Sequence, residues 1–128
     1  MRHYGGARDL AVSAPKKATG VKADADKPRM ELLSTVALRD VAEVLTIGAK
    51  KYTDDNWRGG LSWRRLLGAA LRHTFAFLDG EDLDPETGKS HIAHAMCELM
   101  FLAEEQYTRK DLDDRYDTKL PFGREDSK

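Results

Sequence analysis

The sequence has little that would support a disulfide scaffold, a membrane span or a strong electrostatic partner. Only one of its 128 residues is cysteine, so no intramolecular disulfide can form, which favours a reducing cytoplasm. Its apolar runs are shorter than the roughly 20 residues of a membrane-spanning helix, and its N-terminus lacks the apolar centre of a signal peptide. Basic and acidic residues nearly balance, 21 against 22, so no polynucleotide partner is expected. We expect a cytoplasmic protein, and a small phosphorylated ligand is compatible with this balance because it needs only a local cluster of charge.

The composition is typical of a single folded domain with two arms. Hydrophobic residues make up 41% of the chain and charged residues 34%, as in ordinary globular proteins. Residues 1–27 mix Gly, Ala, Lys and Asp without a hydrophobic period, and residues 117–128 have a similar composition. Such segments bury too little apolar surface to offset their ordering entropy. We predict flexible arms at 1–27 and 117–128, and a folded domain over 28–116.

Three segments have the apolar period of a helix, at about 34–51, 62–78 and 90–107. Ser90 is the expected N-cap of the third. The side chains expected in the core are Trp63, Leu66, Leu67, Ala70, Leu71, Phe77 and Leu78 in the second segment, and Ile92, Ala95, Met96, Leu99, Leu102 and Ala103 in the third. No stretch shows convincing strand alternation. The predicted fold is therefore all-α, an antiparallel helical bundle.

The third segment contains three residues able to bind a metal, His91, His94 and Glu98. Their spacing of i, i+3 and i+7 places them on one face of a helix, beside the expected core stripe rather than inside it. Imidazole nitrogen and carboxylate oxygen both bind divalent metals. The alternative is that these histidines are simply solvated, and the spacing alone does not decide between the two interpretations.

The connector before this helix is strongly acidic. It has the sequence DGEDLDPETGKS, with carboxylates at Asp79, Glu81, Asp82, Asp84 and Glu86. Carboxylates this close repel one another, and either a bound cation or exposure to water relieves the repulsion. A cation site and a solvated acidic loop both fit this pattern.

Two residues near the end of the second segment, Arg72 and His73, are further candidates. His73 lies at the edge of the apolar stripe, where a histidine is more often packed against the backbone than bound to a ligand. Arg72 is either a surface cation or a forked donor to phosphate.

The segment GAKKYTDDNW, which closes the first helix, offers a basic and aromatic group. Lys51 complements the helix dipole at that C-terminus, and it is also placed to bind phosphate. Tyr52 and Trp57 suit either a core or a platform on which a nucleobase stacks, with Asn56 hydrogen-bonding to the edge of that base.

Several familiar catalytic motifs are absent. The sequence has no GxxxxGK[ST] phosphate loop, no HExxH helix and no GxSxG elbow. It also lacks the HD dipeptide of HD-type phosphohydrolases. Cys97 lies in the apolar run AMCELMFL, which predicts a buried, inert thiol.

Three blocks resemble a known family. KPRMELL, GAKKYTDDNW and RHTFAFLDGEDLDPETGKSHIAHAMCELMFL are similar to phage and bacterial dATP/dGTP diphosphohydrolases related to MazG, over residues 27–102. The resemblance implies an all-α fold, a homodimer or higher oligomer, and host cytoplasm if the protein is phage-encoded. It also implies Mg²⁺- or Mn²⁺-dependent hydrolysis of a purine deoxynucleoside triphosphate to the monophosphate and pyrophosphate. The EExxE and ExxD metal helices of better-known MazG-type enzymes are missing from the expected place.

The resemblance implies the following roles for the candidate residues. The metal ligands are Glu81, Asp82, His91 and His94. The catalytic residues are His91, His94 and Glu98, with Glu98 as a further ligand or as the base. The substrate-binding residues are Lys51, Tyr52, Asn56, Trp57, Arg72 and His73. Histidine is an unusual ligand for Mg²⁺, so Mn²⁺ or an outer-shell role for the histidines is also consistent.

Three other functions remain open. The first is a phosphohydrolase that releases inorganic phosphate. The second is a non-catalytic helical module that binds a nucleotide or a protein. The third is a structural helical protein whose histidine and carboxylate cluster binds nothing.

Overall fold

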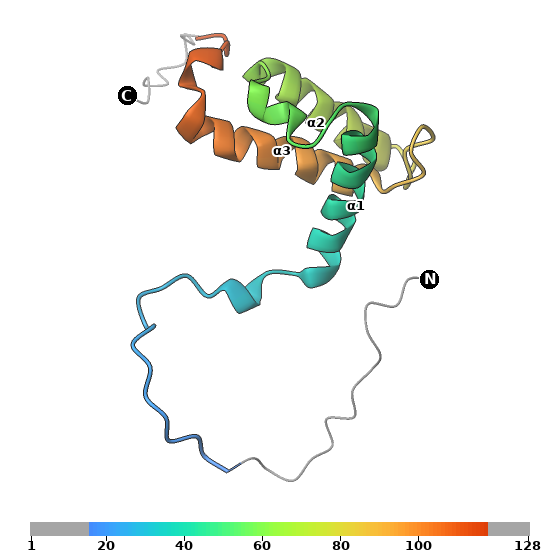
Figure 1. Cartoon of the computed structure of the whole chain (residues 1–128). Coiled ribbons are helices and arrows are strands. Elements are labelled where there is room, and N and C mark those ends of the chain that lie inside the picture. The colour runs from blue at the N-terminus through green and yellow to red at the C-terminus, as the bar shows by residue number, and fades with distance from the viewer. Residues whose placement is uncertain (1–15, 118–128) are drawn as a thin grey trace, which may run out of the picture.

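The computed structural model describes residues 16–117, and these form three long helices and three short 3-10 helices (Figure 1). The long helices are α1 (Thr35–Lys51), α2 (Trp63–Leu78) and α3 (His91–Thr108); the short ones are η1 (Met30–Leu32), η2 (Asn56–Gly59) and η3 (Lys110–Leu112). The described residues form no strand, which confirms the all-α prediction. None of their helices is long and apolar enough to cross a membrane. Residues 1–15 and 118–128 of the predicted arms lie outside the described residues.

Each long helix begins directly after a serine that caps it. The Ser34 and Ser62 hydroxyl oxygens each accept a backbone N–H from the first turn, and the Ser90 oxygen accepts two. A serine cap contributes about 1 kcal/mol because it satisfies donors that have no partner within the helix. The predicted N-cap at Ser90 is confirmed, and the three predicted helices agree with the structure to within a residue at each end.

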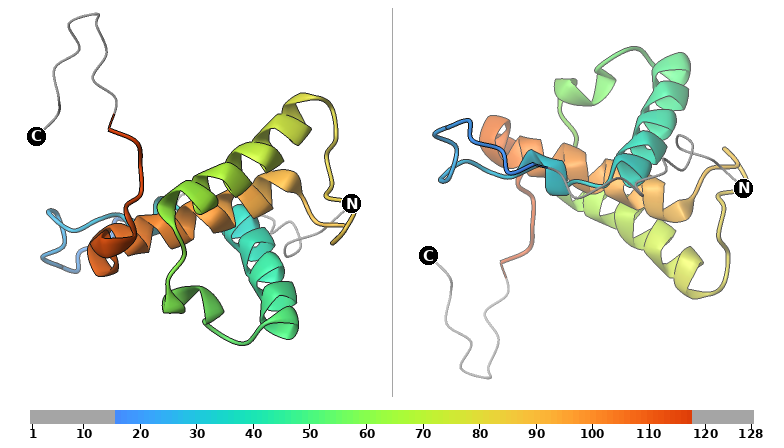
Figure 2. Two further views of the ribbon diagram at one scale, coloured as in Figure 1. Left: turned by 90° about the horizontal axis from the view of Figure 1, so that it is seen from above. Right: turned by 90° about the horizontal axis from the view of Figure 1, so that it is seen from below.

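The helices α2 and α3 form an antiparallel hairpin, and α1 crosses α3 near its N-terminal half (Figure 2). The core at this crossing contains Val41 and Val44 of α1 and Ala93 and Cys97 of α3. Three partly buried side chains pack around it, Leu45, Met96 and Phe101. The predicted burial of Cys97 is confirmed.

The predicted core faces of α2 and α3 are partly wrong. Leu71 is 51% exposed, Leu78 is 78% exposed and Leu99 is 48% exposed. The reason is that α1 packs on the side of α3 that carries Ala93 and Cys97, so it does not cover these leucines. An apolar strip on the hairpin therefore faces solvent in the single chain.

Candidate functional site

The candidate residues gather where α2 ends and α3 begins, around a tightly turned connector. A β-bridge joins Leu83 to Ser90, and the Asp84 N–H donates to the Lys89 carbonyl oxygen at 2.8 Å. Gly88 has a φ of +70°, a left-handed conformation that costs glycine nothing. Its N–H donates to the Asp84 carbonyl oxygen at 2.7 Å. This turn brings the acidic connector back to the first turns of α3.

A buried histidine links the connector to α2. His91 is only 4% exposed, so the expectation that it lies beside the core was wrong. Its Nε2 is 2.6 Å from Oε1 of Glu81, and its Nδ1 is 2.9 Å from Nδ1 of His73. Buried polar atoms need partners, and these two contacts satisfy both ring nitrogens of His91.

A second histidine, His94, faces the connector directly. Its Nε2 is 2.7 Å from Oγ1 of Thr87 and 3.4 Å from Oδ2 of Asp84. The His94 ring stacks on the His73 ring, with centroids 4.5 Å apart and planes 10° apart. The other oxygen of Asp84, Oδ1, accepts the N–H of Glu86 at 3.0 Å. One Asp84 oxygen therefore holds the turn while the other faces the histidines.

Three of these side chains form a candidate metal site. His73, Asp84 and His94 each offer one ligand atom, and the three atoms lie within 4.8 Å of one another. Two imidazoles and one carboxylate are a common donor set for divalent transition metals. A metal–nitrogen bond is about 2.0–2.1 Å long, so two ligand atoms on opposite sides of one ion are about 4.2 Å apart. The separations of the three ligand atoms, at most 4.8 Å, are close to this value, although the stacked rings would have to turn for both to bind one ion.

The surroundings favour the neutral form of these histidines. Burial lowers the pKa of both His73 and His94, although the charge of Asp84 opposes this effect in each case. A neutral imidazole keeps the lone pair that binds a metal. Burial also raises the pKa of Glu98, and the charge of Arg72 partly offsets that rise. A carboxylate with a raised pKa is a stronger base.

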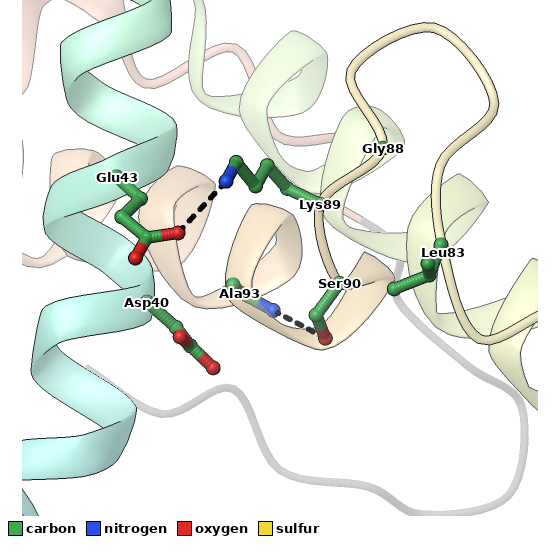
Figure 3. A pocket seen from close by; sticks show the side chains of 7 residues that line it. All are labelled: Asp40, Glu43, Leu83, Gly88, Lys89, Ser90 and Ala93. Carbon is green, nitrogen blue, oxygen red and sulfur yellow. Dashed lines mark hydrogen bonds and ion pairs between the residues drawn. The ribbon is translucent and has the colours of Figure 1, made fainter. Parts of the chain in front are cut away.

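A pocket of about 280 Å³ lies between α1, the connector and the start of α3 (Figure 3). The residues that line it are Asp40, Glu43, Leu83, Gly88, Lys89, Ser90 and Ala93. Lys89 Nζ donates to Oε2 of Glu43 at 2.9 Å, and this ion pair joins α1 to the connector. The connector therefore contributes residues both to the histidine cluster and to this pocket.

Comparison with known proteins identifies the family. The family model described as "dATP/dGTP diphosphohydrolase, N-terminal" matches residues 17–115. The chain belongs to this family. A dATP/dGTP diphosphohydrolase of Salmonella phage PMBT28 is 41% identical to it over 97 residues, which are 76% of this chain and 33% of the relative. The chain thus spans about a third of that relative's length. No solved structure matches.

The basic residues that were predicted for this family member lie near the cluster. Arg72 precedes His73 on α2, close enough for its charge to lower the pKa of His73 and of Glu98. Lys51, at the end of α1, is 3.6 Å from the carboxylate of Glu86 in the connector. Three separate elements therefore bring positive charge and metal ligands to one region.

The predicted base-binding residues lie at the end of α1 and on η2. Tyr52 is 59% exposed, next to Lys51, and Asn56 begins η2. The Trp57 ring stacks on the Phe101 ring, and the ring centroids are 4.6 Å apart. Phe101 lies about two turns after His94 on α3. Trp57 thus already has a protein partner for its ring, and its role toward a nucleobase stays a prediction.

Asp84 was predicted only as one of the five connector carboxylates and not as a metal ligand, and Thr87 was not predicted for the site at all. The prediction favoured Asp82, whose side chain is exposed and whose carbonyl oxygen accepts the His91 N–H at 3.0 Å. Glu81 contacts His91 and is absent from the three-ligand group. The available signal was Gly88, because a glycine four residues after Asp84 indicates a turn that returns the aspartate toward α3.

Proposed function

We propose that this chain provides the nucleotide-hydrolysing site of a divalent-metal-dependent diphosphohydrolase. The proposed substrate is dATP or dGTP, and the products are the monophosphate and pyrophosphate. The observation that carries the proposal is the His73–Asp84–His94 group beside Arg72, since a cation and a forked donor together suit a polyphosphate. The name of the phage relative supports the substrate class.

The proposed mechanism assigns each step to a side chain of this chain. Arg72 and Lys51 bind phosphate oxygens and orient the triphosphate. His73, Asp84 and His94 would hold Mg²⁺ or Mn²⁺, which would supply charge neutralisation and a lowered pKa of water. Glu98 accepts a proton from the attacking water, whose oxygen bonds to the α-phosphorus. The bond from that phosphorus to the bridging oxygen breaks, and pyrophosphate leaves with the electron pair.

We further propose that the protein acts as a homodimer or a higher homo-oligomer. Leu71, Phe75 and Leu78 are spaced i, i+4 and i+7 on α2, and they are 51%, 58% and 78% exposed. An apolar stripe of this kind marks an interaction surface, and a second copy would cover it. Light scattering after gel filtration should give at least twice the chain mass. Phe75→Lys should reduce the assembled fraction, whereas Arg64→Ala, also exposed on α2, should leave it unchanged.

The test of the hydrolysis is a panel of NTPs and dNTPs with Mg²⁺ or Mn²⁺, in which pyrophosphate and inorganic phosphate are measured separately. We expect pyrophosphate from dATP or dGTP. Release of inorganic phosphate alone would contradict the pyrophosphate chemistry. The absence of turnover with every nucleotide and both metals would contradict catalysis by this chain.

A second candidate function is a nucleotide-binding module without catalysis of its own. It is favoured by the match to a family model for an N-terminal part and to a third of the relative's length. This alternative predicts that dATP raises the melting temperature of the protein although no product forms. The same panel, combined with a thermal-shift measurement, separates the two functions.

A further inference from the structure

The contacts of His91 determine which nitrogen of His73 has a free lone pair. An ionised carboxylate only accepts hydrogen bonds, so the 2.6 Å contact with Glu81 requires a hydrogen on Nε2 of His91. Neutral His91 then has its lone pair on Nδ1, which accepts the hydrogen on Nδ1 of His73 at 2.9 Å. This chain of donors leaves the lone pair of His73 on Nε2.

A separate set of contacts acts on His94. The Thr87 hydroxyl oxygen accepts the N–H of Lys89 at 3.2 Å. That hydroxyl has one hydrogen of its own to donate, and Nε2 of His94 is 2.7 Å away. Nε2 of His94, which is also 3.4 Å from Oδ2 of Asp84, then accepts this hydrogen with its lone pair. The lone pair of His73 on Nε2 is not engaged by these contacts, whereas a metal ion would have to displace the Thr87 hydroxyl to bind Nε2 of His94.

We propose that His73, Asp84 and His94 form a site for one first-row transition-metal ion, which they bind in preference to Mg²⁺. Glu81 and His91 are positioning residues, because they act on the ion only through the tautomer of His73. The ion occupies the site of the proposed hydrolysis, and its catalytic role rests on that proposed function. The binding itself does not.

The donor set decides between the metals. Mg²⁺ prefers six oxygen ligands in a near-ideal octahedron and is rarely held by imidazole. Two imidazole nitrogens with one carboxylate suit Mn²⁺, Fe²⁺, Co²⁺ and Zn²⁺. Metal-bound histidines usually donate their other ring N–H to a carboxylate or another acceptor. In this chain the acceptor for His73 is His91, which itself donates to Glu81.

The test uses Co²⁺ alone, without nucleotide, on the full chain. Visible absorption reports protein ligands on Co²⁺, and calorimetry gives the affinity. We expect saturable binding at one ion per chain that excess Mg²⁺ does not reverse, and a loss of at least 100-fold in affinity for His94→Ala. Displacement of Co²⁺ by an equal concentration of Mg²⁺, or an unchanged affinity in His94→Ala, would overturn the proposal.

The role of Glu81 is tested by Glu81→Gln, with Asp79→Asn as the matched control. Both carboxylates are exposed and both substitutions remove one negative charge from the same segment, but only Glu81 contacts His91. We expect Co²⁺ affinity to fall 10- to 100-fold in Glu81→Gln and by less than twofold in Asp79→Asn. The ¹⁵N chemical shifts of the imidazole nitrogens should show a changed His73 tautomer in Glu81→Gln alone. Equal effects of the two variants would refute the positioning role.

These measurements separate the metal site from the hydrolysis. Co²⁺ binding without turnover of any nucleotide would leave the metal site in place and contradict the proposed catalysis. Turnover with Mg²⁺ in a protein that does not bind Co²⁺ would support catalysis and contradict the transition-metal site. Far-ultraviolet circular dichroism of each variant confirms that the helices remain folded.

Discussion

The two ends of the α2–α3 hairpin use buried polar groups in opposite ways. Where α3 begins, His73 and His94 stack on each other and share Asp84 as a neighbour. Towards the end of α3, Glu105 is 1% exposed, and its Oε1 accepts the backbone N–H of Leu61 at 2.9 Å. The first end gathers three candidate metal-ligand atoms around one point. The second end uses its carboxylate to fix the chain entering α2.

This difference indicates that the start of α3 can bind a ligand, whereas the polar group near the end of α3 only stabilises the fold. A carboxylate that accepts a buried backbone N–H contributes to folding because its removal leaves that donor unsatisfied. A neutral imidazole offers a lone pair that can hold a cation. Substitutions at the two ends should therefore separate activity from stability.

The largest effect is expected from His94→Ala at the α3 start. It removes one of three ligand atoms, and pyrophosphate release from dATP or dGTP should fall at least 100-fold, about 2.7 kcal/mol of transition-state stabilisation. Helical circular dichroism should not change. Ile92→Ala, on the exposed side of the same turn, is the control and should retain activity. If His94→Ala kept more than half of the activity, the comparison between the two ends would fail.

The next effect, on stability, is expected from Glu105→Ala at the other end. The free energy of unfolding in urea should fall by about 2 kcal/mol because the Leu61 N–H loses its acceptor. Activity per folded molecule should stay the same. Glu105→Gln keeps a carbonyl oxygen for this N–H and should cost less than half as much. An equal loss in both variants would show that the hydrogen bond is not the source of the stability.

The helices were predictable because their signals are local. A serine stands before each helix, at Ser34, Ser62 and Ser90, and the apolar period continues to the last turn. Capping and periodicity depend only on neighbours in the chain. The boundaries therefore followed from the sequence.

The buried faces of α2 and α3 and part of the candidate site were not predictable, because both depend on how the helices pack against one another. Leu71 and Leu78 are as apolar as core residues, and they are exposed only because α1 crosses α3 elsewhere. His91 is buried because Glu81 and His73 provide polar partners from two other segments. Asp84 reaches His94 through the turn at Gly88, a contact with no periodic signal.

A smaller effect is expected at Cys97, in the core between the two ends. Burial raises the pKa of its thiol to about 12 from an ordinary 9.0, so the folded protein keeps this proton while the unfolded chain loses it. The stability linked to Cys97 is therefore complete below pH 9 and is lost as the pH rises toward 12. Between pH 8 and pH 10, the free energy of unfolding of wild type should fall by about 1.4 kcal/mol relative to that of Cys97→Ala. A constant difference between the two proteins over this range would show that the thiol is not buried.

The smallest effect is expected for the ion pair that joins α1 to the connector. Lys89 and Glu43 are 2.9 Å apart, but their side chains are 30% and 38% exposed, so water and salt screen the attraction. A double-mutant cycle with Lys89→Met and Glu43→Gln should give a coupling free energy of about 0.5 kcal/mol. The coupling should fall further in high salt.

The size of this coupling shows how strongly the ion pair fixes α1 to the connector. Val41 and Val44 pack against α3 and fix the crossing through apolar burial, which salt does not weaken. If the ion pair is weak, α1, which lines the pocket at Asp40, can move relative to the connector without displacing His94. A coupling above about 2 kcal/mol, well beyond exposed pairs, would instead make the connector and α1 one rigid unit. A ligand that binds in the pocket would then also shift the connector residues Asp84 and Thr87, which contact His94.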